Sequence, residues 1–171
     1  HGVHLEGPYI NPKRAGAHAP DLMRTPDIAE LGDIVSILED AFKLITLAAE
    51  LPCGSEALAY LDRAGVVVSL GHTDATFDQA NALFDAGARH LTHTYNAMRS
   101  LHHREPGALG AALTRPGVLC ELIADGIHVH AAAVKIMIGA KGADEVCLIT
   151  DAMAACGMPE GEYTLGPKKV I

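Results

Sequence analysis

Four residues of this chain have side chains that can hold a metal ion and move a proton beside it. Glu6, His72 and His93 offer one carboxylate and two imidazoles. Two neutral imidazoles and one carboxylate, with a further position left open, are a common ligand set for a catalytic metal. Asp151 follows an apolar run, where a carboxylate must be paired or must serve chemistry. Beside an activated water it can accept a proton and then donate it to a leaving amine.

Each of these residues also has a purely structural explanation. A single histidine at a strand end is more often a satisfied polar group than a ligand, and Asp151 can instead cap a helix. The metal hypothesis depends on the candidates occupying equivalent places at the ends of different strands. Glu50 ends another predicted strand, but we rank it below Glu6 because no motif surrounds it.

The elements that must position these residues alternate between strands and helices. Apolar runs, several rich in β-branched residues, predict strands at 3–6, 44–49, 66–70, 90–94, 118–124 and 146–150. Helical patterns are predicted at 30–40, 55–64 with Ser55 as N-cap, 74–86 and 130–140. This alternation predicts a parallel sheet covered by helices. The segments 7–26 and 96–117 show neither pattern and are expected to be long irregular loops.

The polar candidates collect at the carboxyl ends of the predicted strands. That edge is the active-site face of a (β/α)8 TIM barrel and the ligand crevice of an open doubly wound sheet. Six strands predict a partial barrel of about six of the eight βα units over 1–157, followed by a hairpin-like extension at 158–171. The chain has no initial Met and begins directly in motif-like sequence, so we expect a fragment without a signal peptide.

Composition excludes several classes of partner. The formal net charge is -8, which argues against binding to nucleic acid or an anionic membrane. No apolar run is long enough to cross a bilayer. The four cysteines show no CxxC pairing, so we expect them to be reduced and the protein to be cytoplasmic. The ten histidines favour a metal site or acid–base chemistry.

Two further residues are candidates for substrate binding. The guanidinium of Arg104 suits a phosphate or a carboxylate, with a local ion pair to Glu105 as the alternative. His128 follows a glycine turn and can point across a pocket mouth or be a plain polar residue at a loop junction. We assign His4 and His90 structural roles, and expect solvated positions for His102, His103 and His130.

Six motifs, in this order, resemble the N-acetylglucosamine-6-phosphate deacetylase family of the amidohydrolase superfamily. They are HLEGP at 4–8, GHT at 71–73, THTYNAM at 92–98, REPG at 104–107, ADGIH at 124–128 and TDA at 150–152. The resemblance covers essentially the whole chain. It implies an amidohydrolase-type barrel that removes the N-acetyl group of a phosphorylated amino sugar.

The resemblance also implies roles for individual residues. Glu6, His72 and His93 match the family's metal ligands, Asp151 its catalytic acid and base, and His18 a histidine near the acetamide carbonyl. Two neutral imidazoles and a carboxylate accept zinc, which we expect first, or iron, manganese or cobalt. The residues present account for one ion.

The remaining matches concern the substrate and the assembly. Asn96 and Ala97 match a site for the sugar phosphate, and His128 matches a substrate-binding histidine. Arg104 matches a phosphate-binding arginine that can reach a neighbouring subunit, so the resemblance implies a homodimer. Two alternatives stay open: a hydrolase for an uncharged or carboxylated amide, and a non-catalytic module that binds a sugar phosphate.

Overall fold

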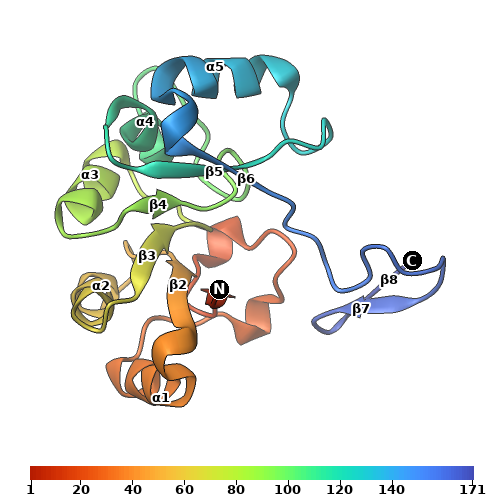
Figure 1. Ribbon diagram of the computed structural model, residues 1–171. Helices are drawn as coiled ribbons and strands as arrows, with labels where there is room; N and C mark the ends of the chain where they lie inside the picture. The colour runs from red at the N-terminus through yellow and green to blue at the C-terminus, as the bar shows by residue number, and fades with distance from the viewer.

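The computed structural model describes residues 1–171, which form an α/β fold around one parallel sheet. Its six strands lie in chain order, each parallel to its neighbours: β1 (Val3–Glu6), β2 (Phe42–Leu47), β3 (Val67–Leu70), β4 (His90–Leu91), β5 (Leu119–Ile123) and β6 (Val146–Ile149). The sheet curves into a half-barrel with helices along its outer side (Figure 1). The predicted parallel α/β architecture is confirmed to this level.

Five helices lie between these strands. They are α1 (Ile28–Leu38), α2 (Gly54–Arg63), α3 (Phe77–Asp85), α4 (Gly107–Thr114) and α5 (Ala131–Lys141), with short 3-10 turns at Pro12–Arg14, Pro20–Leu22, Glu39–Ala41 and Ala143–Glu145. Side-chain caps stabilise the amino ends of two helices. Asp27 accepts hydrogen bonds from the backbone at the start of α1, and Thr76 forms a capping box with Gln79 at the start of α3. The predicted cap Ser55 is wrong, because α2 begins after Cys53, which has a left-handed backbone and no side-chain cap bond.

Helix α4 contradicts the expectation that 96–117 is irregular throughout. Its residues Gly107 to Ala112 are all buried, so the segment has no polar stripe from which a helical period could be recognised. The helix packs against α3 and α5 on the outer side of the sheet. The segment 7–26 is irregular as expected, apart from two short 3-10 turns.

The two faces of the sheet differ in polarity. The outer face carries side chains such as Ile45, Val68 and Leu122, which join the helices in a core cluster of 28 buried residues. The inner face carries a chain of hydrogen bonds from His4 to Thr46 (2.7 Å), Thr46 to Thr92 (2.7 Å) and Thr92 to Ser69 (2.5 Å). A sheet with helices on one face and a polar layer on the other is consistent with part of a barrel wall.

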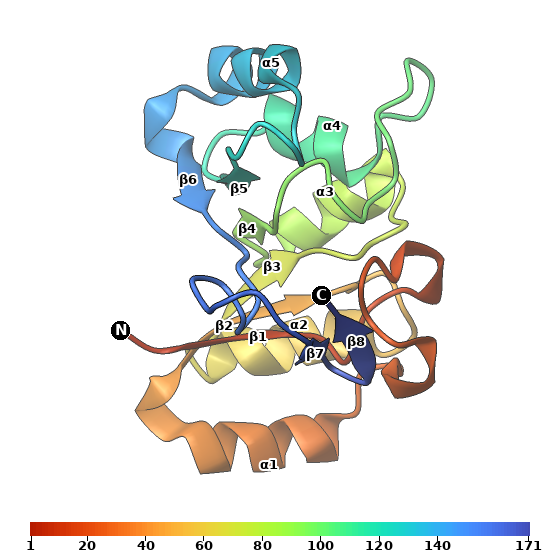
Figure 2. The same ribbon diagram turned by 90° about the vertical axis from the view of Figure 1, so that its right-hand side faces the viewer.

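The chain ends in a small hairpin that projects from this body (Figures 1 and 2). Strands β7 (Tyr163–Leu165) and β8 (Lys168–Val170) pair antiparallel with each other and not with the main sheet. Lys168 donates to the carbonyl of Ala17, in the loop after β1, over 2.8 Å. None of the helices combines the length and apolar character needed to cross a membrane.

Candidate metal centre at the carboxyl ends of the strands

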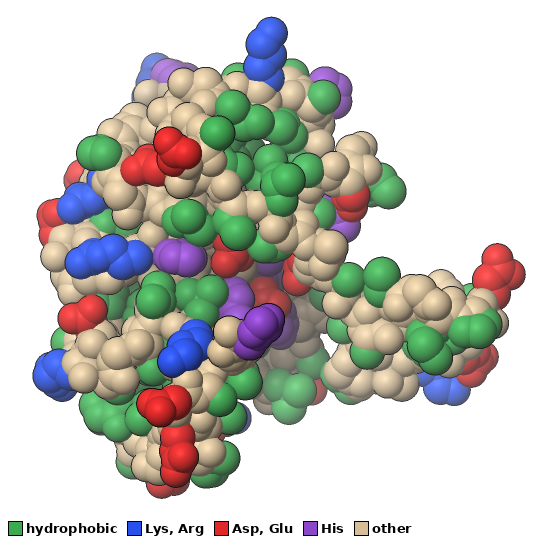
Figure 3. All heavy atoms as spheres, viewed as in Figure 1, with side chains coloured by type: hydrophobic (Ala, Val, Ile, Leu, Met, Phe, Trp, Pro, Cys, Tyr) green, Lys and Arg blue, Asp and Glu red, His purple; other side chains and the backbone are tan.

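The loops that follow the strands carry unusual backbone angles. Of the seven residues other than glycine with positive φ, five lie in these loops, at His72, His93, Tyr95, Ala97 and Asp151; the other two are Glu39 and Cys53, at the end of α1 and the start of α2. Such conformations cost about 1–3 kcal/mol each and cluster at functional sites. Histidine and acidic side chains gather near the middle of the face shown in Figure 3. Most of the backbone strain therefore falls at the edge of the sheet where the candidate residues were predicted to lie.

Glu6, His72 and His93 meet at this edge. Glu6 Oε1 lies 2.8 Å from His72 Nε2 and 2.9 Å from His93 Nε2, and the two nitrogens are 3.0 Å apart. Both histidines are buried, whereas the Glu6 side chain is partly open to solvent. Each comes from a different strand end, so parallel topology brings together residues far apart in the chain. They form a group with the geometry of a possible metal site.

The protonation of His72 shows why this group suits a cation. His72 Nδ1 lies 2.7 Å from the carbonyl oxygen of Arg14, and a carbonyl can only accept, so Nδ1 carries a proton. In neutral His72 the lone pair of Nε2 then faces the Glu6 carboxylate and His93 Nε2. Three electron-rich atoms in contact need a cation between them, either protons or a metal. The donor set therefore fits a divalent metal such as zinc.

The ionisation of Glu6 and His93 follows from the same contacts. Burial raises the pKa of Glu6, but the close contacts of its carboxylate with the rings of His18, His72 and His93 outweigh burial and hold the pKa far below its usual range. Burial lowers the pKa of His93, but its hydrogen bond to Glu6 and the charges of Glu6 and Asp151 raise that pKa above the ordinary value. Both shifts favour the charged forms of the two side chains, an anionic Glu6 and a protonated His93.

We therefore expect metal binding to compete with protons. Imidazole binds a metal only when its ligand nitrogen is unprotonated. Because the pKa of His93 is raised, protons compete with the metal for this nitrogen up to a higher pH than they would at an ordinary histidine. Zinc affinity should be full above that pKa and fall as the pH drops through it. Chelator competition across a pH series measures this. An affinity independent of pH from 5 to 8 would contradict the proposed ligands.

His18 and Asp151 border the group. His18 Nε2 lies 3.6 Å from Glu6 Oε2, and its ring meets that of His72 edge-on with centroids 4.8 Å apart. Asp151 is exposed, directly after β6, and its charge acts on His93. Both residues lie beside the candidate ligands without belonging to the group.

The predicted substrate residues lie on neighbouring loops. Asn96 and Ala97 lie in the turn after β4, where the Asn96 side chain donates to the carbonyl of His93 over 3.1 Å. Arg104 is exposed and does not pair with Glu105, whose carboxylate instead accepts from the backbone of α3 and α4. His128 is exposed and its Nδ1 lies 2.6 Å from Asp125 Oδ2. The structure does not bring Arg104 or His128 into contact with the metal group.

Other histidines and Glu50 lie apart from the ligand group. His102, His103 and His130 are exposed, and His130 caps α5 through its ring. Glu50 makes hydrogen bonds to Asn11, Thr73 and the backbone of Asp74. Glu50 therefore connects the loop after β2 to the loops after β1 and β3.

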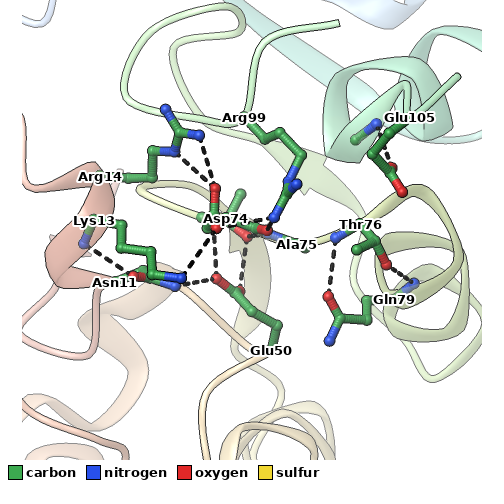
Figure 4. A network of polar contacts seen from close by, with 12 residues as sticks. Asn11, Lys13, Arg14, Glu50, Asp74, Ala75, Thr76, Gln79, Arg99 and Glu105 are labelled. Carbon is green, nitrogen blue, oxygen red and sulfur yellow. Dashed lines mark hydrogen bonds and ion pairs between the residues drawn. The ribbon is translucent and has the colours of Figure 1, made fainter. Parts of the chain in front are cut away.

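Sequence analysis missed a polar network beside the group (Figure 4). Asp74 is its centre and makes ion pairs with Lys13, Arg14 and Arg99, which come from the loops after β1 and β4. Helix α3 begins only at Phe77, not at Asp74 as predicted, so Asp74 remains in the strand-end loop. The only sequence signal was its place two residues after His72.

The parallel half-barrel and the Glu–His–His group at its strand ends define an α/β chain that forms part of a barrel wall and carries a possible metal site. No family model matches it. Over 169 residues, 99% of the chain, it is 46% identical to N-acetylglucosamine-6-phosphate deacetylase from Lysinibacillus sphaericus and to N-acetylgalactosamine-6-phosphate deacetylase from Escherichia coli O157:H7. The chain is thus homologous over its whole length to amino-sugar-6-phosphate deacetylases, which confirms the resemblance inferred from its motifs.

Solved structures give the same result. The crystal structure of N-acetyl-D-glucosamine-6-phosphate deacetylase from Mycobacterium smegmatis matches with a TM-score of 0.94 and 46% identity over 97% of this chain. A mutant of that enzyme, solved in complex with N-acetyl-D-glucosamine-6-phosphate, matches with a TM-score of 0.95. The chain spans 45% and 44% of the lengths of the E. coli and L. sphaericus relatives, so these comparisons concern less than half of each enzyme.

Proposed function

We propose that the protein is a metal-dependent deacetylase that hydrolyses N-acetylglucosamine 6-phosphate to glucosamine 6-phosphate and acetate in amino-sugar catabolism. The observation that carries the proposal is the convergence of Glu6, His72 and His93 at the strand ends. The names of the relatives supply the substrate class. The proposal includes a complete (β/α)8 barrel of the amidohydrolase type, with 1–157 as part of its catalytic wall and 158–171 as an extension.

The proposed chemistry divides between the ion and the chain's own residues. A divalent metal at this site lowers the pKa of water and polarises a carbonyl. Asp151 accepts a proton from the attacking water and returns it to the departing amine, so the proton count balances. His18 donates a hydrogen bond to the acetamide oxygen as negative charge develops there. We propose one ion, zinc first, with iron, manganese or cobalt also suited to these ligands.

Binding of the sugar phosphate is assigned to the loops around the group. Asn96 and Ala97 lie in the strained turn after β4, next to His93. His128 is proposed to contact the sugar, and Arg104 the phosphate. Because Arg104 is exposed and free of Glu105, it can extend to the site of a second subunit in the proposed homodimer. The unpaired cysteines fit a cytoplasmic location.

The function is tested with zinc-loaded protein and three amides: N-acetylglucosamine 6-phosphate, unphosphorylated N-acetylglucosamine and N-acetylgalactosamine 6-phosphate. N-acetylglucosamine 6-phosphate should be hydrolysed with a far higher kcat/KM than unphosphorylated N-acetylglucosamine. The Arg104→Ala variant should lose about 10- to 100-fold of this kcat/KM, since a hydrogen bond to a charged group is worth about 1.5–3 kcal/mol. Its activity on the unphosphorylated sugar should not change. Release of free amine measures all three reactions.

Three outcomes would redirect the proposal. If Arg104→Ala keeps the preference for the phosphorylated sugar, the phosphate is bound elsewhere, or an uncharged or carboxylated amide is the substrate. N-acetylgalactosamine 6-phosphate is the third amide, because one relative is named for it. A higher kcat/KM for that epimer would change the sugar and keep the mechanism. Sugar-phosphate binding without hydrolysis would leave only a binding module.

A further inference from the structure

Arg14 and Asp74 form an ion pair beside the ligand group that the proposed chemistry does not use. Arg14 Nε and Nη2 both donate to Asp74 Oδ1, over 3.0 and 2.8 Å. The Asp74 side chain is only 13% exposed and that of Arg14 is 33% exposed, so the pair is partly shielded from solvent on the Asp74 side. Figure 4 shows the guanidinium of Arg14 pointing at this carboxylate. The pair joins the loop after β1 to the loop after β3.

The backbone of the same loop holds His72. The carbonyl of Arg14 accepts the proton on His72 Nδ1 over 2.7 Å, and the amide of Asn11 donates to the carbonyl of His72 over 2.9 Å. The first contact selects the tautomer that directs the Nε2 lone pair toward Glu6. The guanidinium and this carbonyl both belong to Arg14. The ion pair that holds the guanidinium therefore also limits the movement of the carbonyl.

Asp74 is itself held by two other loops. Arg99, after β4, donates to Asp74 Oδ2 over 2.9 Å and to its carbonyl oxygen. Glu50, after β2, accepts from the amide of Asp74 over 2.8 Å. These bonds fix the position of Asp74, and Asp74 in turn restrains the side chain of Arg14.

The restrained loop also lies tightly against His72. A Cβ on Gly16 would approach His72 Cε1 to 3.0 Å, and Gly16 has a φ of +56°, which favours glycine. His18 follows two residues later and packs edge-on against His72. A shift of this loop would therefore displace both the Arg14 carbonyl and His18.

We infer that the Arg14–Asp74 ion pair is a positioning device for metal binding. It holds the Arg14 carbonyl against His72 Nδ1, fixes the tautomer whose Nε2 can bind the ion, and holds His18 beside Glu6. Arg14 and Asp74 are positioning residues, since they act through His72. The inference rests on the metal-centre part of the proposed function and does not depend on which sugar is hydrolysed.

Arg14→Gln in the whole protein tests it directly. Loss of an outer partner of a metal-binding histidine costs about 10- to 100-fold in affinity, and this is the upper limit for a variant that frees the carbonyl without removing it. We therefore expect a measurable loss of zinc affinity up to that limit, determined with zinc alone by chelator competition. At a pH where the His72 ring of the metal-free protein is neutral, long-range ¹H–¹⁵N spectra should show its Nδ1–H tautomer, and the variant should show a mixture of tautomers. Arg14→Lys should restore part of the affinity. Asp74→Asn breaks the pair from the other side and should repeat both results.

Arg115→Gln is the matched control, because it removes an ion pair to Asp85 next to the amino end of β5. It should leave zinc affinity and the His72 tautomer unchanged. The inference is overturned if Arg14→Gln keeps both the affinity and the tautomer, or if Arg115→Gln loses affinity equally. Wild-type protein that binds zinc but hydrolyses no amino sugar would refute the proposed reaction and leave this inference standing.

Discussion

Replacing Asp151 with Asn should leave the metal bound and reduce turnover by about 10²–10⁴-fold, the usual contribution of a general acid and base. Asparagine keeps the shape of the side chain but cannot take a proton from water or donate one to a leaving amine. Asp151 is exposed after β6 and is not one of the three converging ligands. Measured kcat should therefore fall while metal content, determined by elemental analysis, stays constant.

A matched control for Asp151 lies at the other end of β6. Asp144 is an exposed carboxylate just before the amino end of β6, away from the ligand group. Asp144→Asn should have wild-type kcat and metal content. If Asp151→Asn retains near-normal kcat, Asp151 has no role in proton transfer. If it loses the metal, Asp151 belongs among the ligands instead, and its proposed role in the mechanism must change.

The candidate ligands were predictable because strand ends are predictable. Short apolar runs located all six strands of the sheet, with bounds that differ by only a few residues from those observed. In a parallel sheet the carboxyl ends lie at one edge, so a polar residue at each end is placed by topology alone. Glu6, His72 and His93 needed no knowledge of the loops to be grouped together.

The supporting residues were not predictable in this way. The Arg14–Asp74 pair depends on how the loop after β1 folds back over β3, and no period or spacing encodes that path. Helix α4 was missed for a different reason: its first six residues are all buried, so it has no amphipathic pattern. Arg104 was left between phosphate binding and an ion pair with Glu105, and only the structure shows Glu105 accepting from backbone amides instead.

Glu6→Gln should have the largest effect on metal binding. Glutamine keeps the length of the side chain but replaces the anionic oxygen that meets both His72 and His93. Zinc affinity should fall by more than the roughly 10- to 100-fold expected for loss of an outer partner, because a direct ligand and a negative charge are both removed. Chelator competition measures this loss.

The same variant has a second consequence in the metal-free protein. Glu6 raises the pKa of His93 through a hydrogen bond and through its charge, so Glu6→Gln should lower that pKa. A pH titration of the His93 ring by NMR measures the shift. Glu56→Gln, an exposed change on α2, should alter neither the affinity nor the pKa. A Glu6→Gln protein with unchanged zinc affinity would remove Glu6 from the ligand set, and the two histidines would then need another anionic partner from outside the group.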